Sequence, residues 1–388
     1  MNNSQAPKAL SIALVINRYF DFGGLQKEML RIAKLFIERG HQVEIISSDY
    51  EGELIAGVTR YIVPFTAKAN HKKMQQLALI LERRKKEKHF DTIIGFNKIP
   101  GIDFYFAGDV CLAEKIDKEK SSLVKILPRY RHYLKFEKAV FDTESHCQIL
   151  LLAHGARSTY EHYYQTDPQR FHLMPPGVAK DRFAMNFDRE AAKRQLRKDW
   201  QLAADANVII HVGSAFHRKG ADRIIKAMHA LPEALKEKTF LFVIGDDNAK
   251  KCVALASKLQ LIDHVIFTGP RNDVDQFYQG ADLLVHPARE ECTGMTIMEG
   301  LFCGLPVITT ENCGFAWHIK NANAGHVVDY PFKQLQLNSH LEDILSLNAH
   351  LWQQLSESAQ HYCLTEQVHN LSEAVVEVVE NNQPKGSL

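Results

Sequence analysis

Strand-like apolar runs alternate with amphipathic, helix-like segments along most of this chain, and this alternation constrains the fold more than any other feature. The first run, LSIALVIN at 10–17, is apolar enough for a buried strand, and residues 25–39 carry apolar side chains at helical spacing before Gly40. Further strand-like runs are HQVEIIS at 41–47, YIVPF at 61–65 and DTIIGFN at 91–97. Because parallel strands need long crossovers, usually helices, the pattern predicts a parallel sheet in an α/β fold.

The sequence LMPPGV at 173–178 interrupts the alternation, because two prolines and a glycine continue neither a helix nor a central strand. A charged helix at 189–200 follows, and then a second series of strand-like runs: VIIHVG at 208–213, TFLFVIGD at 239–246, HVIFTG at 264–269, ADLLVHP at 281–287 and LPVITT at 305–310. At 388 residues the chain exceeds the ~250–300 residues at which a single core stops growing. We therefore predict two doubly wound, Rossmann-like domains that face each other across a cleft.

The hinge gives predicted domain boundaries. The N-terminal domain spans 1–176 and the C-terminal domain spans 177–364. Residues 365–388 contain the amphipathic pattern LSEAVVEVVENN, which predicts a short helix that packs back on the N-terminal domain before a disordered tail. Ligands of such sheets bind outside the carboxyl ends of the strands, so the loops that follow the strands are the places to look for a site.

Composition limits the partners and the compartment. The formal net charge is only +1, so a partner recognised by charge has to meet a local basic surface. Seven cysteines without a CxxC spacing favour free thiols in a reducing, cytosolic compartment over a disulfide framework or a zinc site. Only Lys8 supplies a charge ahead of the first apolar run, and no signal-peptide cleavage site follows it, so we expect a strand and no export. No apolar run approaches the ~20 residues of a membrane-spanning helix.

Two adjacent glycines mark the first candidate loop, NRYFDFGGLQ at 17–26. Gly23 and Gly24 stand directly before a helix, where they let the backbone approach a ligand closely and leave the N–H groups of the helix start for an anion. The spacing is not GxGxxG, so a dinucleotide cofactor is poorly supported. A tight turn without a ligand explains the glycines equally well.

Two adjacent cations mark the second candidate loop, HVGSAFHRKGADR at 211–223. Arg218 and Lys219 stand just ahead of a helix that we expect to begin near Gly220. Two cations and a helix N-terminus at one sheet edge suit a diphosphate, and arginine can bind two of its oxygens at once. The order of residues differs from a Walker A loop, so phosphoryl transfer is not implied. The alternative is a solvated pair of cations on an ordinary loop.

The third candidate segment, EECTGMTIMEG at 290–300, places carboxylates on both sides of an expected helix start at Gly294. Glu299 then lies about 7.5 Å along the helix axis, and its side chain leans back toward the N-terminus. If the helix N–H groups bind phosphates while Glu291 and Glu299 accept hydrogen bonds from hydroxyls, the segment suits a nucleotide sugar. The alternative is that Glu291 only complements the helix dipole and Glu299 faces solvent.

Patterns for a metal ion are weak. The tripeptide DVD at 273–275 resembles a metal-binding Asp-x-Asp, but it opens a helix, where aspartate is an expected cap. The histidines show no spacing that groups them, and His286 at a strand end is expected to be a packed or capping residue. We therefore expect neither a metal ion nor a cofactor.

The segment 115–141 interleaves cations with aromatic and aliphatic side chains. This composition fits a surface that rests on an anionic bilayer or on a phosphorylated acceptor, and a solvated helix face is the alternative. No recognised nucleic-acid-binding motif accompanies it, so nucleic acid is not an expected partner. We call the following residues the basic patch: Lys115, Lys118, Lys120, Lys125, Arg129, Tyr130, Arg131, Tyr133 and Lys135. Further cations in the same domain are Lys72, Lys73, Arg83, Arg84, Lys85 and Lys86.

Together these segments resemble the retaining GT-B glycosyltransferases of family 4. The resemblance rests on FGG after the first strand, on the HVGSAFHRKGADR loop, and on Glu291 and Glu299 with seven residues between them. The longer segments FDFGGLQ, GFNKIPGIDFYFAGDVCLAEK, RYRHY, MPPG, GPRNDV and CGLPVITTENCG extend it over nearly the whole chain. These segments are similar to the lipopolysaccharide core heptose glucosyltransferases within that family.

The resemblance implies transfer of glucose from UDP-glucose to an inner-core heptose of lipopolysaccharide, in α-1,3 linkage, without a divalent metal. Arg218 and Lys219 would neutralise the diphosphate leaving group, and Glu299 would bind the ribose. Glu291 and the backbone that follows it would hold the glucose and phosphates. The implied catalytic residues are Asp109, Glu291 and Lys219. The implied donor-binding residues are Gly23, Gly24, Arg218, Lys219, Arg271, Glu291, Cys292, Thr293, Gly294, Met295 and Glu299.

Several alternatives stay open at this point. The tripeptide CTG at 292–294 stands where close relatives are expected to carry small alanines, which leaves the donor sugar open. Another family 4 hexosyltransferase, a GT-B nucleotide-sugar epimerase and a non-enzymatic nucleotide-binding module at a membrane surface are the competing hypotheses. Under the favoured one we expect a cytoplasmic enzyme, peripherally associated with the anionic inner membrane face.

Overall fold

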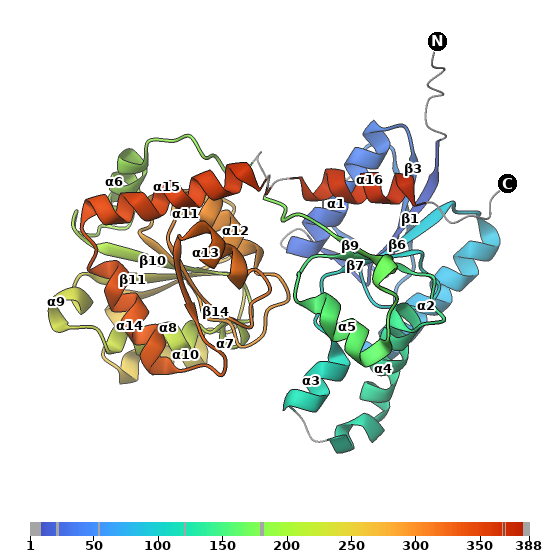
Figure 1. Ribbon diagram of the computed structural model, residues 1–388, viewed down its shortest axis with the longest axis horizontal. Coiled ribbons are helices and arrows are strands. Elements are labelled where there is room, and N and C mark those ends of the chain that lie inside the picture. Colours follow the sequence, from blue (N-terminus) through green and yellow to red (C-terminus); the bar gives the residue numbers. More distant parts are fainter. Residues whose placement is uncertain are drawn as a thin grey trace, which may run out of the picture. The chain divides into compact units, whose positions relative to one another are not determined.

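The computed structural model describes residues 9–20, 23–52, 55–119, 122–178, 182–366, 368 and 370–382. The chain forms two compact units, one of Met1–Met174 with Leu371–Leu388 and one of Pro175–Asn370. The predicted domain boundaries were 176/177 and 364/365. In each unit helices cover a parallel sheet (Figure 1), so the predicted fold class of two doubly wound α/β domains is confirmed.

A seven-stranded parallel sheet forms the centre of the N-terminal unit, in the order β5-β3-β1-β6-β7-β8-β9. Its strands are β1 (Ser11–Val15), β3 (Gln42–Ser47), β5 (Val58–Ile62), β6 (Thr92–Gly95), β7 (Phe104–Ala107), β8 (Gln148–Leu151) and β9 (Phe171–Leu173). A separate parallel pair joins β2 (Tyr19–Phe20) to β4 (Tyr50–Glu51). The order of the strands reverses between β1 and β6, and ligands of doubly wound sheets bind at the carboxyl ends of such strands.

Helices cover both faces of this sheet. They are α1 (Gly24–Glu38), α2 (Asn70–Glu87), α3 (Leu112–Glu119), η1 (Ser122–Ile126), α4 (Pro128–Phe141), α5 (Ala156–Tyr164), η2 (Pro168–Arg170) and α16 (Leu371–Asn381). Alternate side chains of β1 enter the two cores, because Ile12 packs with α1 and α16 whereas Ala13 packs with α2, α4 and α5. The C-terminal helix that the sequence predicted is α16, and it packs against α1.

The local signals along the first segment fit the structure with one correction. Helix α1 ends where Gly40, with φ of 86°, adopts the left-handed conformation and donates its N–H to the carbonyl of Ile37. The strand predicted from YIVPF at 61–65 was wrong in its bounds, because β5 ends at Ile62. Pro64 has no N–H to donate to a neighbouring strand, so the strand ends before it.

The C-terminal unit holds a six-stranded parallel sheet in the order β12-β11-β10-β13-β14-β15. Its strands are β10 (Asn207–Val212), β11 (Thr239–Ile244), β12 (Val265–Gly269), β13 (Leu283–His286), β14 (Val307–Thr310) and β15 (Gly325–Val328). The helices are α6 (Arg189–Asp199), α7 (Phe216–Lys219), α8 (Ala221–His229), α9 (Glu233–Lys236), α10 (Lys250–Lys258), η3 (Ile262–His264), α11 (Val274–Gly280), α12 (Met295–Phe302), α13 (Ala316–Ala322), α14 (Gln334–Leu345) and α15 (Ala349–Thr365). Here the order reverses between β10 and β13.

All seven cysteines are free thiols, and only Cys292 among them is partly exposed. This agrees with the expectation that the chain carries no disulfide framework. Among the residues that the structure describes, no helix is long and apolar enough to cross a bilayer.

Candidate active site at the switch point of the C-terminal unit

The loops that follow β10 and β13 meet where the strand order of the C-terminal sheet reverses. Lys219 Nζ lies 3.1 Å from Glu291 Oε2, and Arg218 Nη1 lies 3.7 Å from the same oxygen. Arg218 also donates to the Glu290 carbonyl at 2.7 Å. The two cations and the glutamate come from segments about 70 residues apart in the sequence. They form one cluster at the place where doubly wound sheets bind ligands.

A buried histidine completes the cluster. His286 Nε2 lies 3.5 Å from Glu291 Oε2, and His286 Nδ1 lies 3.4 Å from the Thr296 hydroxyl. The sequence predicted a packed residue at this position, and His286 is fully buried, but the order of the strands also places it against the glutamate. We call Arg218, Lys219, His286 and Glu291 the switch-point cluster.

Neighbouring groups keep the Glu291 carboxyl of this cluster ionised. Burial would raise the pKa of the Glu291 carboxyl, but the neighbouring His286 and the Lys219 cation outweigh it and hold that pKa well below 4.5. Burial lowers the pKa of His286, so its imidazole is neutral near pH 7. Within the described chain, Glu291 Oε2 and His286 Nε2 are buried without a hydrogen-bond partner. Because unsatisfied buried polar atoms cost free energy, a ligand hydroxyl that contacted either atom would be stabilised.

Lys219 is positioned by a helical turn, where the sequence predicted an open loop. The turn is α7, and its Phe216 N–H donates to the Asp247 carboxylate at 2.7 Å. Gly213 precedes the turn with φ of 131°, and a Cβ at that position would lie 2.8 Å from Lys219 Nζ. The glycine therefore leaves room for the lysine side chain to fold back toward the end of β10.

Helix α8 and the loop after β13 are clamped together by contacts that the sequence did not reveal. Gly220 has φ of 86°, and a Cβ there would lie 2.1 Å from the Pro287 carbonyl oxygen. Arg223 donates to that same carbonyl at 2.9 Å. Arg289 pairs with Asp222 through two bonds of 2.7 and 2.8 Å. Each of these charges looks ordinary in sequence, and only the topology shows that they face one another.

The start of α12 matches the sequence prediction. Gly294, with φ of 88°, occupies the cap position, and the helix begins at Met295. A Cβ on Gly294 would lie 2.7 Å from Cys313 Sγ, so the close approach requires glycine. The Thr293 carbonyl accepts the N–H of Phe315 at 2.8 Å. The partly exposed backbone of Cys292 and Thr293 is thus fixed from behind by the segment after β14.

Glu299 lies in the second turn of α12 and has a protein partner. The Tyr278 hydroxyl donates to Glu299 Oε2 at 2.7 Å. Burial and the neighbouring carboxylate raise the pKa of Tyr278 well above 10.0, so the hydroxyl stays protonated and donates. Tyr278 was missed from sequence because a buried aromatic residue on a helix gives no functional signal. The hydrogen bond fixes the orientation of the Glu299 carboxylate. The alternative from sequence, in which Glu299 only faces solvent, included no such partner.

Arg271 is not brought into the switch-point cluster. Its guanidinium makes two hydrogen bonds to the Asp273 carboxylate, at 2.7 and 2.5 Å, and lies over the Phe277 ring. Asp273 occupies the cap position of α11, yet its side chain binds Arg271 and does not cap the helix as predicted. The DVD pattern therefore has its first carboxylate already engaged by Arg271.

The two predicted glycines of the N-terminal unit lie at the start of α1. Gly23 occupies the cap position, and a Cβ there would meet the flexible Gln26 side chain. A Cβ on Gly24 would meet no atom of the described residues within 4 Å. The sequence predicted that a ligand approaches the backbone closely here. The structure offers open space at Gly24 for such an approach, and its backbone is not strained.

Asp109 follows β7 on an exposed loop that is held from beneath by a buried ion pair. Lys98 Nζ donates to Glu137 Oε2 at 2.5 Å and to the Val110 carbonyl at 2.8 Å. Glu137 also accepts the N–H of Leu112, the first residue of α3, at 2.9 Å. Burial alone would lower the pKa of Lys98, but the carboxylates of Glu137 and Asp109 outweigh it and raise that pKa. The loop that carries Asp109 is therefore rigidly supported.

A cavity of about 300 Å³ lies at the switch point of the N-terminal sheet. Its walls come from the ends of β1, β3 and β6 together with α2 and α4. The lining residues are Asn17, Arg18, Ser48, Phe65, Asn70, Lys73, Met74, Asn97 and Tyr133. Tyr133 belongs to the predicted basic patch and Lys73 to the additional cations, whereas the asparagines carried no sequence signal. The cavity offers mainly polar groups and two cations.

The basic patch spans α3, η1 and α4, which project together from the N-terminal unit (Figure 1). Lys118 pairs with Glu114 at 2.7 Å, and Lys125 pairs with Asp117 at 2.7 Å. Arg129, Arg131 and Lys135 are exposed, while Lys120 lies outside the described residues. At the junction of η1 and α4, Ile126 is 69% exposed and Leu127 is 51% exposed. The structure thus places exposed apolar side chains directly beside the arginines.

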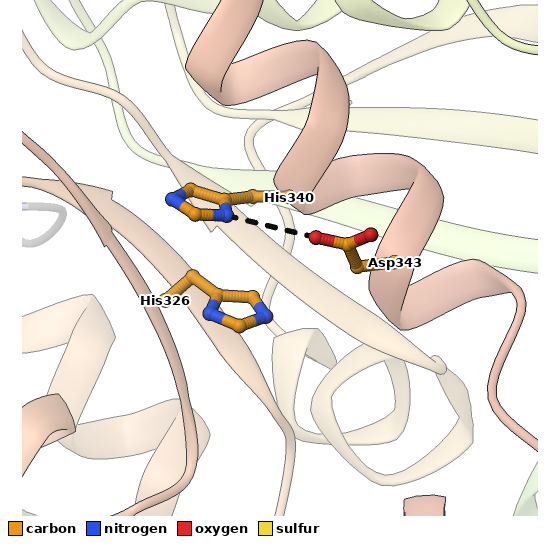
Figure 2. A group of neighbouring side chains, drawn as sticks. All are labelled: His326, His340 and Asp343. Carbon is orange, nitrogen blue, oxygen red and sulfur yellow. Dashed lines mark ion pairs between the residues drawn. The ribbon is translucent and has the colours of Figure 1, made fainter.

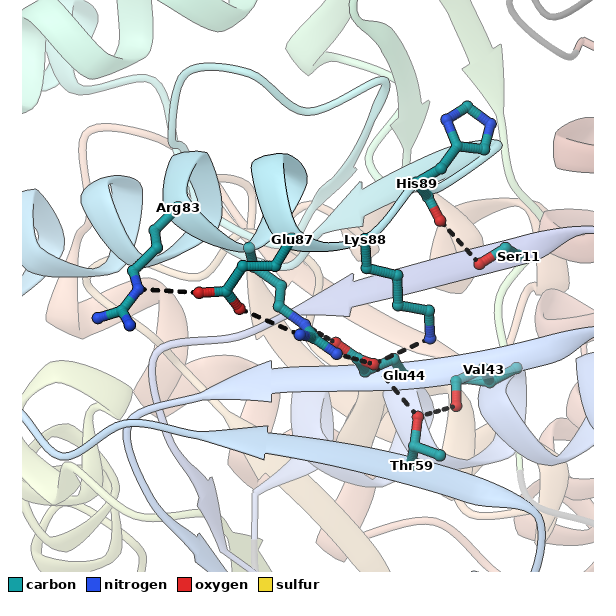
Figure 3. Close-up of polar contacts among 9 residues, drawn as sticks. Ser11, Val43, Glu44, Thr59, Arg83, Glu87, Lys88 and His89 are labelled. Carbon is teal, nitrogen blue, oxygen red and sulfur yellow. Dashed lines mark hydrogen bonds and ion pairs between the residues drawn. The ribbon is translucent and has the colours of Figure 1, made fainter.

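Some of the additional cations are structural. Arg84 and Lys88 both bind the buried carboxylate of Glu44, at 2.7 and 3.0 Å, and Arg83 binds Glu87 at 2.9 Å (Figure 3). These pairs attach the end of α2 to β3. Arg84 is therefore engaged within the protein, whereas Arg83, with a side chain that is 77% exposed, remains at the surface of α2.

Comparison with known proteins agrees with this geometry. Residues 192–362 match the family model of glycosyl transferases group 1. The lipopolysaccharide glucosyltransferase WaaG of Escherichia coli (strain K12) is 38% identical over 95% of this chain and 98% of its own length. A D-inositol 3-phosphate glycosyltransferase of Geodermatophilus obscurus is 27% identical, covering 80% of this chain and 75% of the relative.

Solved structures give the same result. The crystal structure of WaaG superposes with a TM-score of 0.91 at 37% identity, over 96% of this chain and all of WaaG. Anabaena Alr3699/HepE in complex with UDP-glucose superposes with a TM-score of 0.72 at 15% identity, over 96% of this chain and 100% of that one, which shows the shared fold. The fold and the position of the switch-point cluster are those expected of a GT-B glycosyltransferase, and one such relative matches almost the full length of the chain. The chain therefore belongs to the GT-B glycosyltransferases, in the family of the lipopolysaccharide glucosyltransferase WaaG.

Proposed function

We propose that this enzyme transfers glucose from UDP-glucose to an inner-core heptose of lipopolysaccharide, in α-1,3 linkage and with retention of configuration. One observation carries the proposal: the Lys219 cation, the buried Glu291 carboxylate and the open start of α12 converge at the switch point. This arrangement offers positive charge for a diphosphate and an acceptor oxygen for sugar hydroxyls. The name of the relative WaaG supports the donor sugar and the acceptor class.

The donor would be held by complementary groups along the loops after β10 and β13. Arg218, Lys219 and the N–H groups at the start of α12 face the diphosphate. Glu291 and neutral His286, each with a buried atom that lacks a hydrogen-bond partner, bind hydroxyls of the glucose. Glu299, oriented by Tyr278, accepts hydrogen bonds from the ribose.

Catalysis would be electrostatic. Departure of UDP places growing negative charge beside Lys219 and Arg218, and preorganised cations at such a position lower the barrier. No side chain is assigned as a nucleophile, so the acceptor hydroxyl attacks on the face from which UDP leaves, and the leaving phosphate takes its proton. Asp109 would lie near the reaction centre. The cations take the part of a divalent metal, so we propose metal-independent turnover.

The acceptor would bind the N-terminal unit. The cavity at the β1–β6 switch point presents amide, hydroxyl and ammonium groups, which suit a phosphorylated oligosaccharide. The basic patch with exposed Ile126 and Leu127 would rest on the anionic inner face of the membrane, where the acceptor is anchored.

Membrane association is tested by sedimentation with anionic and neutral vesicles. Replacing Arg129 and Arg131 by glutamate should weaken binding to anionic vesicles by more than tenfold, because each cation contributes about 1 kcal/mol near such a surface. Lys34→Glu on α1 is the matched control. Equal binding by the patch variant and the control would remove the patch from the proposal.

The decisive experiment measures turnover of UDP-glucose with a heptose-terminated core acceptor in the presence of EDTA. We expect acceptor-dependent release of UDP and an α-linked glucoside by NMR. Conversion of the donor without acceptor would indicate an epimerase, and turnover only with another nucleotide sugar would indicate a different hexosyltransferase. A covalent glucosyl adduct on Asp109 or Glu291 would overturn the front-face mechanism.

A further inference from the structure

A second group of chemistry-bearing side chains lies in the C-terminal unit outside the switch-point cluster. His340 and Asp343 stand three residues apart on one face of α14, and His326 is the second residue of β15. One ligand atom from each of the three side chains lies within 4.8 Å of the other two. Figure 2 shows the His326 ring beneath the His340 ring, with Asp343 beside His340. The sequence had given no spacing that groups these histidines, because 14 positions separate them.

The group combines two stacked imidazole rings with a buried ring nitrogen that lacks a partner. The two imidazole rings are parallel within 10°, with centroids 4.4 Å apart. His340 Nδ1 is buried and, within the described chain, has no hydrogen-bond partner, while Asp343 Oδ2 lies 3.9 Å away. An imidazole nitrogen that points at a carboxylate without bonding to it leaves room for a third participant. The side chain of His340 is 19% exposed and that of Asp343 is 57% exposed, so solvent reaches the group from one side.

We propose that His326, His340 and Asp343 form a binding site for a first-row divalent metal ion of the zinc class. Two imidazole nitrogens and one carboxylate oxygen are borderline ligands that suit Zn²⁺, and three protein ligands leave a fourth position for water. Ligand atoms around a tetrahedral zinc lie about 3.3 Å apart, given bonds of about 2.0–2.1 Å. Rotation of the exposed Asp343 side chain, together with turning of the two stacked rings so that each aims a nitrogen at the ion, closes the remaining gap.

The packing of α14 supports the site. Leu337, Leu341 and Ile344 on the same helix are buried in the core, so α14 presents its two ligands from a firmly packed element.

The location separates this site from the transfer reaction. Strand β15 lies at the edge of its sheet, and His326 is near the amino end of that strand. The switch-point cluster follows the carboxyl ends of β10 and β13. A metal here would tie the edge strand to α14, a clamp on an otherwise unpaired edge, and would take no part in UDP release.

The test uses the full chain, treated with a chelator and then dialysed. Zn²⁺ titrated by calorimetry should bind at one site, and His326→Ala, His340→Ala and Asp343→Asn should each weaken binding by at least about tenfold. Co²⁺ should give the visible absorption of a four-coordinate site that Asp343→Asn removes. The exposed His350→Ala and His361→Ala are matched controls.

Stability provides an independent readout. All three tryptophans, Trp200, Trp317 and Trp352, belong to the C-terminal unit, so their fluorescence follows unfolding of that unit. Saturating Zn²⁺ should raise its thermal midpoint in the wild type, and by less in Asp343→Asn. Because Asp343 is exposed, this variant is expected to fold, and circular dichroism verifies it. Wild-type zinc affinity in the Asp343→Asn and His326→Ala variants, or no zinc binding at all, would overturn the proposal.

Discussion

Glu291 and Lys219 form an almost buried ion pair, with side chains that are 12% and 16% exposed. Removing two charges from water is costly, and an ion pair of this kind adds little net stability. Its position at the mouth of α12 gives it another use. Without a ligand the lysine neutralises the glutamate, and with a sugar diphosphate the phosphates engage the lysine while hydroxyls engage the glutamate. The same two side chains therefore have a charged or polar partner in both states.

Loss of the lysine should impair the reaction more than the fold. For Lys219→Ala we expect kcat/KM to fall by about 100- to 1,000-fold, because one preorganised group that stabilises developing charge is removed. Lys219→Arg should retain more activity, and the exposed Lys258→Ala should behave as wild type. Steady-state assays with UDP-glucose measure the change in kcat/KM. Urea unfolding of Lys219→Ala and of the double variant Lys219→Ala/Glu291→Gln shows how much stability is lost because the glutamate is left unpaired. Full activity of Lys219→Ala would contradict the assigned role.

The low pKa of Glu291 predicts how stability depends on acid. A carboxyl whose folded-state pKa lies below 4.5 contributes stability that is fully present above 4.5 and lost as pH falls toward the folded pKa. Wild type should therefore lose stability more steeply than Glu291→Gln below about pH 4.5. Tryptophan-detected urea midpoints from pH 7 to pH 3 measure the difference. Glu342→Gln, at an exposed position on α14, is the control, and parallel curves for wild type and Glu291→Gln would disprove the effect.

At the scale of elements, the site depends on close packing of two loops. Gly220 combines a left-handed φ with a backbone contact, whereas Gly269 has φ of 70° and nothing within 4 Å of its Cβ position. Gly269→Ala should thus cost about 1–2 kcal/mol from strain alone. Gly220→Ala should cost more, because the loop after β13 has to shift away from the Pro287 carbonyl contact. Tryptophan-detected urea unfolding compares the two, and equal losses would show that the contact is easily relieved.

Particular elements show what could be predicted from sequence. The strands β1, β10 and β13 and the start of α12 were predictable because period, glycine caps and apolar runs are local signals. The meeting of Lys219 with Glu291 followed from the general rule for doubly wound sheets. The contacts of Tyr278, Asp222 and Arg289 were not predictable, because they depend on which strands are neighbours. The Arg271–Asp273 pair was missed because Asp273 can either cap α11 or pair with Arg271, and the sequence favoured the cap.

At the scale of the whole molecule, α16 links the two ends of the sequence. Its Leu371, Val375, Val376 and Val379 are buried in the core of the N-terminal unit. Glu380 binds Arg39 at 2.7 Å and His41 at 2.9 Å. The N-terminal unit is therefore built from both ends of the chain, with the C-terminal unit inserted between them.

Truncation tests this dependence. A chain that ends at Asn370 lacks four buried aliphatic side chains, worth roughly 6–12 kcal/mol as an upper estimate at about 1.5–3 kcal/mol each. That is comparable with the ~5–15 kcal/mol stability of a typical protein, so the N-terminal unit should unfold and become sensitive to protease. The tryptophan-detected transition of the C-terminal unit should persist. A chain that ends at Asn382 is the control, and a protease-resistant N-terminal unit in the shorter chain would contradict the expectation.

The late return of α16 has a consequence for biosynthesis. A ribosome makes the residues of the first sheet early, but the helix that covers one of its faces is made only after the whole C-terminal unit. The inserted unit can mature during this interval, whereas the first sheet stays incomplete until α16 has emerged. A chain that stops before α16 therefore leaves an uncovered apolar surface for cellular quality control to find.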